Sequence, residues 1–427
     1  MKRRVAIIAG MSFPPIASAS VHRVLAWLRY LPRFDWNGEV FTLPEDYRPR
    51  ADLDASLLAL IPSASQVHRV DPIWPKRIPQ SRTMNAEVGA SGVPEGPGWR
   101  LVHFVKDRIG VPDARLLWVP PAFGSFLASH RRHHYDAVVS TSQENSSHMV
   151  GLIASVVLRV PWVADFQDPW RSPWLPLRHG LHERLDRSLA RTVLRRSDAI
   201  TAISPNVGRS LEEDYRADRG KIEVIPNGFE PTTAEPMKER ATGDRFTLLH
   251  TGRFYGQRTP AWFLRAVDSY IADHPEIGER LLVRFIGAFD EPSAAAVAPY
   301  ADRSWLNIVR PVPHADALQA QAEADALLLI PGERSMSMPG KIFEYLRTGR
   351  PMLCIASDDS DAAVLLRELN TGSVVRPDDS AALERFFHAA LIDRSLGAHT
   401  EPIAQLDRYQ WRHTVERMAQ VLDQVVT

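Results

Sequence analysis

Short runs of aliphatic and β-branched residues alternate along almost the whole chain with longer stretches in which apolar residues recur every three or four positions. The short runs are typical of buried parallel strands, and the longer stretches are typical of amphipathic helices. The alternation predicts an α/β fold in which helices connect the strands of parallel sheets. In the first half it predicts helices at 21–30, 146–158 and 181–195 and strands at 5–9, 39–42, 137–140, 162–165, 199–203 and 221–225.

A second alternating series begins at Phe246. It predicts helices at 260–271, 315–323 and 341–347 and strands at 246–250, 281–286, 326–330 and 352–355. Between the two series, residues 226–231 contain turn residues, and the polar stretch 232–244 lacks apolar periodicity, which indicates a linker. The pattern therefore predicts two successive α/β units. Prolines and glycines interrupt residues 45–119, which we expect to form an insertion with long loops.

The composition of the 427 residues, with 44% hydrophobic and 24% charged residues, is that of a globular protein and excludes a disordered or coiled-coil chain. The 51 Lys and Arg equal the 51 Asp and Glu, so bulk charge gives no reason to expect nucleic-acid binding. The charge is unevenly placed, because residues 1–230 carry 30 basic against 24 acidic residues. Arginines and aromatic residues alternate within 99–135, a pattern that suits an anionic membrane surface. A solvated helix face with core aromatic residues behind it gives the same pattern.

One cysteine, Cys354, excludes an intramolecular disulfide and a cysteine-based zinc site, so a reducing compartment is expected. The first apolar run is short and is followed by Pro14 and Pro15, which predicts a strand rather than an export signal. No apolar run approaches the ~20 residues of a membrane-spanning helix. We therefore expect a cytoplasmic protein, either soluble or peripheral on the inner face of the cell membrane.

Two segments of the second half carry candidate binding chemistry. Residues 246–258 run from a strand through a glycine-containing turn that bears Arg253 and Arg258. Backbone N–H groups and guanidinium groups at such a turn could hold a diphosphate, or both arginines could be ordinary surface residues. In the second segment, Pro339 and Gly340 open a helix on which Lys341 and Glu344 share one face. These two side chains could bind a phosphate and ribose hydroxyls, or could simply pair with each other.

No metal site is predicted. The triplets 52–54 and 359–361 fit an Asp-x-Asp pattern, but such triplets are common by chance, and helix capping explains the second one. His148 and His250 are the histidines closest to candidate sites, and a buried, hydrogen-bonded structural role is the expected one for each.

The second half resembles the donor domain of retaining, family 4-like glycosyltransferases of the GT-B fold. The resemblance lies in Thr251-Gly-Arg253 with Arg258, in Gly340-Lys341-Ile-Phe-Glu344-Tyr-Leu, and in Gly349-Arg-Pro351. Other motifs resemble a subgroup of that family that builds bacterial envelope polysaccharides. They are Phe13-Pro-Pro15 with Val21-His-Arg23, Val111-Pro-Asp-Ala-Arg115 with Trp118, Ser147-His148 with Gly151, Trp162-Val-Ala-Asp-Phe-Gln-Asp-Pro-Trp170, Ala199-Ile-Thr-Ala-Ile-Ser204, Ile225-Pro-Asn-Gly-Phe229 and Tyr409-Gln-Trp411.

The resemblance implies two Rossmann-like domains that face a cleft, an acceptor-side domain at 1–230 and a nucleotide-sugar donor domain at 231–405. A terminal helix at 406–427 would cross back to the first domain. The resemblance also implies transfer from a UDP- or GDP-sugar, without a metal, to a glycan, lipid-linked or small-molecule acceptor. It assigns catalysis to Arg253, Arg258, Lys341 and Asp168, and donor binding to Gly252, Arg253, Arg258, Val312, Gly340, Lys341 and Glu344. It assigns the acceptor and sugar side to Ser18, His148, Asp165, Gln167 and Asp168.

Two positions depart from the family pattern. The chain has Ala17-Ser-Ala-Ser20 where the family has a glycine-rich loop, and Met336 where the family has the earlier of two glutamates, with Glu333 out of register. Two other functions therefore remain open: a nucleotide-sugar 2-epimerase of the same fold, and a catalytically silent nucleotide- or sugar-binding protein.

Overall fold

The computed structural model describes residues 2–16, 18–47, 53–73, 111–113, 115–171, 180–230, 245–332, 338–393, 395–396 and 404–427. The described residues form two compact units. The first unit contains the described residues up to Gly228 together with Trp411–Thr427, and the second contains those from Phe229 to Gln410. The linker expected at 232–244 lies outside the described residues, as do Ala17, Glu333 and Met336.

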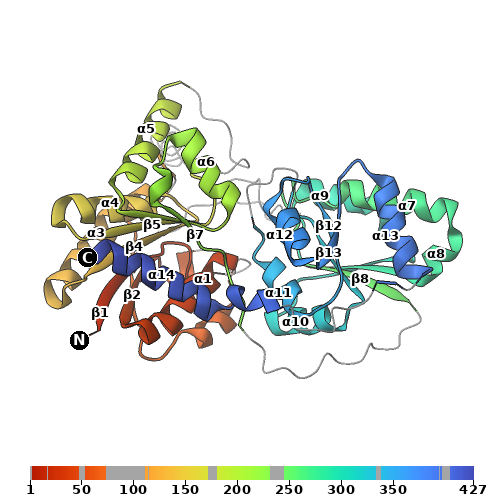
Figure 1. Cartoon of the computed structure of the whole chain (residues 1–427), viewed down its shortest axis with the longest axis horizontal. Helices are drawn as coiled ribbons and strands as arrows, with labels where there is room; N and C mark the ends of the chain where they lie inside the picture. Colours follow the sequence, from red (N-terminus) through yellow and green to blue (C-terminus); the bar gives the residue numbers. More distant parts are fainter. Residues whose placement is uncertain are drawn as a thin grey trace, which may run out of the picture. The chain divides into compact units, whose positions relative to one another are not determined.

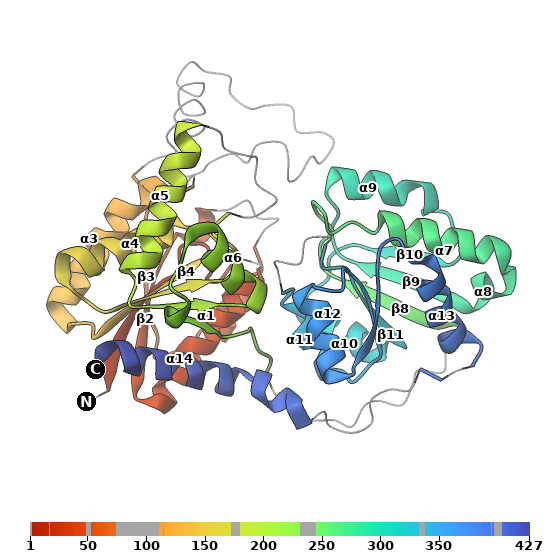
Figure 2. The same ribbon diagram turned by 45° about the horizontal axis from the view of Figure 1, so that its top comes forward.

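The first unit is built on a parallel sheet with the strand order β3-β2-β1-β4-β5-β6-β7. Helices α3, α4, α5 and α6 lie on one face of the sheet, and α1 and α14 lie on the other, as Figures 1 and 2 show. The elements are β1 (Arg3–Ile8), α1 (Ala19–Tyr30), β2 (Trp36–Thr42), β3 (Gln66–Arg69), α3 (Val119–His133), β4 (Ala137–Ser142), α4 (Ser146–Leu158), β5 (Trp162–Phe166), α5 (Leu181–Arg196), β6 (Ala199–Ala202), α6 (Pro205–Tyr215), β7 (Ile222–Val224) and α14 (Trp411–Val426).

The second unit contains a parallel sheet with the strand order β10-β9-β8-β11-β12-β13. Helix α7 contacts α9 and α13, and Figure 2 shows α10, α11 and α12 gathered on the opposite side of the sheet. The elements are β8 (Phe246–Thr251), α7 (Ala261–Asp273), α8 (Pro275–Arg280), β9 (Leu281–Ile286), α9 (Glu291–Val297), β10 (Leu306–Val309), α10 (His314–Glu323), β11 (Ala326–Leu329), α11 (Lys341–Arg347), β12 (Met352–Ile355), α12 (Asp361–Leu369), β13 (Gly372–Val375) and α13 (Ser380–Leu391).

The predicted terminal helix is present as α14, and it completes the core of the first unit. Its residues Trp411, Val415, Met418 and Leu422 are buried in the same apolar cluster as the first sheet. The helix packs along α1, and Asp423 accepts a hydrogen bond from Trp36 Nε1 at 2.8 Å. The last helix of the chain is therefore part of the first unit.

The central strands β4, β5 and β11 are buried along their whole length because helices cover both faces of each sheet. The carboxyl ends of the strands carry the polar residues of interest: β5 ends at Phe166, just before Gln167, and β8 ends at Thr251, just before Gly252. In open parallel sheets, ligands bind outside this edge of the strands. Candidate side chains of each unit therefore lie where such folds place their sites.

Candidate functional site

The turn after β8 passes close to α11. Gly252 has a φ of 112°, and a side chain there would place its Cβ 2.7 Å from Lys341 Nζ. Glycine therefore allows the backbone to come this close to the lysine. The neighbouring strand end shows the same requirement, because a Cβ on Gly287 would lie 1.9 Å from the carbonyl oxygen of Gly252.

Most backbone N–H groups of this turn bind the protein itself. Gly252 N donates to Ile286 O at 2.8 Å, Phe254 N to Ala288 O at 2.9 Å, and Gly256 N to Asp290 Oδ2 at 2.8 Å. Fewer backbone N–H groups of this turn are therefore available to bind a phosphate than the sequence predicted. The cationic side chains become the main groups on which anion binding here would depend.

Thr251 is held through all three of its polar groups by side chains from α10 and α11. Its N–H donates to Tyr345 Oη at 2.9 Å, and its carbonyl oxygen accepts from Lys341 Nζ at 2.6 Å. Its Oγ1 accepts from Gln321 Nε2 at 3.0 Å. The end of β8 and the start of α11 are thus fixed to each other by buried hydrogen bonds, each of which would be costly to lose.

Lys341 and Arg258 place two positive charges close together. Burial and the nearby Arg258 guanidinium lower the pKa of Lys341 to about 7, against the opposing effect of Glu344. Arg258 stacks on the Tyr255 ring, with 5.0 Å from Cζ to the ring centroid, and Nη1 donates to Tyr255 Oη at 2.7 Å. Two cations in an enclosed place repel each other, so an anion bound beside them would relieve that repulsion.

The Glu344 carboxylate is oriented by two donors. His314 Nε2, at the start of α10, lies 3.0 Å from Oε1, and Gln321 Nε2 lies 3.3 Å from Oε2. The side chain remains 28% exposed, so a ligand could reach it. His314 and Gln321 had no part in the sequence prediction, because only the folded chain brings α10 to α11.

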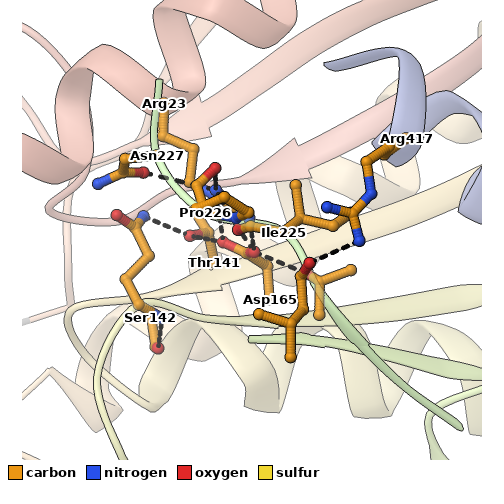
Figure 3. Close-up of polar contacts among 11 residues, drawn as sticks. Arg23, Thr141, Ser142, Asp165, Ile225, Pro226, Asn227 and Arg417 are labelled. Atoms are coloured by element: carbon orange, nitrogen blue, oxygen red, sulfur yellow. Dashed lines mark hydrogen bonds and ion pairs between the residues drawn. The ribbon is translucent and has the colours of Figure 1, made fainter. Parts of the chain in front are cut away.

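In the first unit, Arg23 and Asp165 form a buried ion pair that Figure 3 shows in close-up. Arg23 Nη2 lies 2.7 Å from Asp165 Oδ1, and Nε lies 3.2 Å from the same oxygen. The carboxylate also accepts from Thr141 Oγ1 at 2.7 Å and from Thr201 Oγ1 at 2.6 Å. Asp165 is 0% exposed, and these partners all belong to the first unit.

Arg23 also contacts the chain just before the second unit begins. Its Nη1 donates to Ile225 O at 2.9 Å and to Pro226 O at 3.2 Å. From α14, Arg417 Nη2 donates to Val224 O at 2.7 Å, and Figure 3 shows both arginines at this segment. Two cationic side chains therefore fix the path of residues 224–226.

Gln167 is connected to the ion pair through one hydroxyl. Its Nε2 donates to Thr141 Oγ1 at 2.8 Å, and the same hydroxyl donates to Asp165. His148 is completely buried beside Phe166, and burial lowers its pKa to about 3, so the ring is neutral. Its Nδ1 lies 2.8 Å from Ser140 Oγ.

Comparisons with known proteins decide the family. The family model described as Glycosyltransferase Family 4 matches residues 21–233. The chain belongs to glycosyltransferase family 4. It is a glycosyltransferase, an enzyme that moves a sugar from a nucleotide sugar to an acceptor.

Similar proteins share this assignment or this fold. A D-inositol 3-phosphate glycosyltransferase of Geodermatophilus obscurus is 25% identical over 324 residues, which cover 68% of this chain and 67% of that protein. A glycosyltransferase structure from Rickettsia africae superposes with a TM-score of 0.67 at 11% identity and covers 100% of this chain and 99% of that one. The Anabaena protein HepE, solved with UDP-glucose, has a TM-score of 0.60 at 15% identity, with 99% of each chain covered. The structures show that the glycosyltransferase has the GT-B fold predicted from its sequence.

The glycosyltransferase brings most of its predicted donor residues together. Gly252 and Lys341 approach closely, Arg258 lies near enough to lower the pKa of Lys341, and Gly340 directly precedes α11. Val312 packs at the margin of the apolar cluster that contains α11. Arg253 is half-buried in the turn.

The predicted sugar-side residues differ in accessibility. Asp165, Gln167 and His148 are buried, whereas Ser18 and Asp168 are partly exposed. Ser18 precedes α1, and its Oγ lies 2.6 Å from Ser20 Oγ. Ser18 and Asp168 are therefore the members of this set that a ligand could reach directly.

Helix capping is the role of Asp54 in the first Asp-x-Asp triplet and of Ser360, the middle residue of the second, while Asp361 lies in the first turn of α12. Asp54 Oδ1 accepts from Ser56 N at 2.9 Å, and Ser360 caps α12 by accepting from Ala363 N at 3.1 Å. Within the described ranges, no group of three or more His, Cys, Asp and Glu side chains is placed to hold a metal ion.

The aromatic residues between 115 and 135 belong to the core of the glycosyltransferase. Trp118, Phe126 and Tyr135 are at most 1% exposed, while Arg131 and Arg132 are exposed on α3. The aromatic part of the pattern predicted for a membrane surface is thus explained by packing. Trp99 and Phe104 lie outside the described residues. None of the described helices is both long enough and apolar enough to cross a bilayer.

Proposed function

We propose that the second unit binds a nucleoside diphosphate sugar, with UDP or GDP as the nucleotide, at the carboxyl end of β8. Arg253, Arg258 and Lys341 would contact the diphosphate, and Glu344 would accept hydrogen bonds from the ribose hydroxyls. Val312, just before α10, would lie beside the base. The observation that carries the proposal is the pair of enclosed cations, Arg258 and Lys341, next to Gly252.

The same cations would assist the reaction. Breaking the bond between sugar and phosphate develops negative charge on the departing diphosphate and positive charge on the anomeric carbon. Fixed cations aimed at that growing negative charge stabilise the transition state, and removal of one such group typically costs about 10²–10³ in rate. The rigid hydrogen bonds around Thr251 keep Lys341 in place for this role. We propose retention of anomeric configuration and no requirement for a metal.

The first unit would supply the acceptor and sugar side. Asp168 and Ser18 are the accessible candidates for direct contact, and Asp165 would orient Gln167 through Thr141. His148 would stabilise the carboxyl end of β5 by packing on Phe166 in the core. Acceptors to test are D-inositol 3-phosphate, which the name of the curated relative specifies, together with glycans and lipid-linked sugars.

We also propose peripheral contact with an anionic, cytoplasmic membrane surface through exposed arginines such as Arg131 and Arg132. Cosedimentation with anionic but not neutral vesicles, weakened by salt, would support this contact. Equal behaviour with both vesicle types would favour a soluble acceptor.

A nucleotide screen followed by product analysis tests the proposed function. The full chain is incubated with nucleoside diphosphates and its thermal stability is measured, since a ligand that binds the folded state raises the melting temperature. Each stabilising nucleotide is then supplied as its sugar conjugate, with and without acceptors, and NMR identifies the products and their anomeric configuration. Acceptor-dependent transfer with retention supports the proposal. Epimerised donor without acceptor, or tight binding without turnover, would replace it with one of the alternatives.

A further inference from the structure

His250 lies inside the second unit, one residue before Thr251, and it has no role in the proposed reaction so far. The residue is 1% exposed. Its Nδ1 lies 3.0 Å from Leu328 O, and its Nε2 lies 3.2 Å from Lys341 Nζ. A carbonyl oxygen only accepts, so Nδ1 carries the proton and donates it to Leu328. The Nε2 lone pair of the neutral ring therefore faces the lysine.

Aromatic packing fixes the orientation of this ring. His250 stacks on Phe254 with 4.1 Å between centroids and 17° between planes, and it meets the edge of Phe285 at 6.1 Å. A tilted ring would lose the stacking, and a ring flipped by 180° would keep the stacking but lose the hydrogen bond to Leu328. Nε2 is thus kept in one direction.

The ring stays neutral over the working pH range. Burial lowers the pKa of His250 well below its usual value, the charges of Lys341 and Arg258 lower it further, and the bond to Leu328 opposes them only in part. A neutral ring does not compete with Lys341 for an anion, and it keeps an acceptor available.

We propose that His250 is a positioning residue that aims the Lys341 ammonium at the donor diphosphate by accepting one of its three hydrogen bonds. The inference rests on the donor site proposed above. Thr251 O accepts a second hydrogen bond, at 2.6 Å. An ammonium group has three donors, so the two protein acceptors leave one N–H for a phosphate oxygen. The lysine then meets the diphosphate in a fixed direction instead of as a mobile charge.

The arrangement also determines how donor binding depends on pH. Among the described residues, the groups that shift the pKa of Lys341 are Arg258, which disfavours the ammonium, and Glu344, which favours it. The lone pair of neutral His250 favours the ammonium through a hydrogen bond. His314, from α10, contacts the Glu344 carboxylate, with 3.0 Å between Nε2 and Oε1. Loss of the His250 acceptor would lower the pKa of Lys341, so the decline of donor affinity at alkaline pH would begin at a lower pH.

The test compares His250→Phe, which keeps an aromatic ring but has no acceptor, with His250→Gln, which retains a carbonyl acceptor. UDP or GDP, whichever stabilises the wild-type chain, is titrated by calorimetry between pH 6 and 9. A hydrogen bond to a charged group contributes about 1.5–3 kcal/mol, so His250→Phe should weaken affinity by about 10- to 100-fold. The fall of nucleotide affinity at alkaline pH should also begin at a lower pH in His250→Phe than in the wild type. His250→Gln should recover part of the lost affinity and part of the shift in pH.

Two controls separate positioning from packing. Phe254→Leu removes the stacking partner but keeps the acceptor and the hydrogen bond from His250 Nδ1 to Leu328 O, so it should lower the melting temperature but move the decline of donor affinity at alkaline pH much less than His250→Phe does. Should His250→Phe fail to fold, His250→Met makes the same comparison, because its flexible thioether fills space and accepts hydrogen bonds only weakly.

The outcomes are distinct. Wild-type affinity and an unchanged pH dependence in a folded His250→Phe or His250→Met variant would overturn the role of His250 while leaving the donor site in place. A wild-type chain that binds neither UDP nor GDP would overturn the donor site, and the inference with it.

Discussion

Arg23 and Asp165 pair inside the first unit with both side chains at most 1% exposed, although 142 residues separate them in the chain. The pair connects α1 to the end of β5, and Arg23 extends from there to the backbone of Ile225 and Pro226. Asp165 is thus connected through Thr141 to Gln167, at the carboxyl end of β5. Through Arg23 it is also connected to residues 225–226, which lead out of the first unit.

Asp165→Asn should destabilise the first unit strongly. The amide keeps the shape but leaves the buried Arg23 guanidinium without its counter-charge, and breaking a buried ion pair on one side typically costs about 3–5 kcal/mol. Denaturant unfolding would measure the loss. The matched control is Asp268→Asn, which breaks the exposed pair with Arg303 and should change stability by less than about 1 kcal/mol. Equal effects of the two substitutions would contradict the importance of the buried pair.

Gly151→Ala should also destabilise the first unit. A Cβ on Gly151 in α4 would lie 2.2 Å from Trp162 Nε1, whose N–H donates to Ser140 Oγ at 2.7 Å. Overpacking of this kind costs about 1–3 kcal/mol, which a shift of the thermal midpoint would report. Gly124→Ala in α3 is the control, because its Cβ meets no atom within 4 Å. It should be neutral or stabilise the helix by up to about 1 kcal/mol.

Stability between pH 4.5 and 2 should depend on Glu39. Burial alone raises the pKa of this carboxyl, but hydrogen bonds from His68, Tyr135 and Arg4 outweigh it and hold the pKa at about 2. Because the folded-state pKa is below the unfolded value of about 4.5, the contribution is complete above pH 4.5 and is lost as the pH falls toward 2.

The measurement for Glu39 is the denaturation midpoint as a function of pH. Glu39→Gln should be less stable than the wild type at pH 6, and the difference should shrink as the pH falls through this window. A difference that is constant from pH 6 to pH 2 would show that the ionised carboxylate is not what stabilises the fold here.

Glu344→Gln and Arg253→Ala should affect different steps. The amide keeps one carbonyl acceptor for the ribose but loses the charge and faces His314 and Gln321 with one donor group, so donor affinity should fall by about 10-fold or more. Arg253→Ala removes a cation aimed at the leaving diphosphate, so turnover should fall more than donor affinity. Calorimetry and steady-state rates separate the two.

Glu279→Gln on the exposed surface of α8 is the control for these variants and should change neither quantity. If Glu344→Gln and Arg253→Ala both kept wild-type affinity and rate while folded, the donor site would have to lie elsewhere.

Transfer should survive excess EDTA. The proposed site places Arg253, Arg258 and Lys341 where a metal-dependent enzyme would hold its cation against the diphosphate. Rates measured before and after chelation, with manganese and magnesium added back, give the answer. Activity that is lost with EDTA and restored by either metal would rule out the metal-free mechanism.

The alternating pattern predicted the elements of both sheets that have continuous apolar runs. Helix 146–158 and strand 281–286 were predicted with the bounds that the structure has, because their periodicity is clear. The short strands β3, β10 and β13 were missed, since each has four residues, several of them partly exposed, and no long apolar run. Helix α3 was missed because prolines at its start and the mixed arginines and aromatic residues obscured its period.

The candidate site could be predicted only in part. Arg253, Arg258, Lys341 and Glu344 lie in two short motifs, so local sequence was sufficient to name them. The partners that orient them come from elsewhere: Gln321 and His314 lie on α10, and the ion pair of Arg23 joins segments far apart in the chain. Such contacts depend on how sheets bring distant segments together, and no local pattern encodes them.

The position of α14 has a consequence for synthesis of the protein. The ribosome makes this helix after all of residues 229–410, yet Trp411, Val415 and Met418 complete the core of the first unit. The described residues of the second unit all come from 229–410 and can fold as soon as they emerge, whereas the first unit must wait for α14 with the α1 side of its sheet only partly covered. Domains usually fold in the order in which they are made, and exposed apolar surface favours aggregation during the delay. The unit translated first is therefore the unit that finishes folding last, and it is the one that would most need a chaperone.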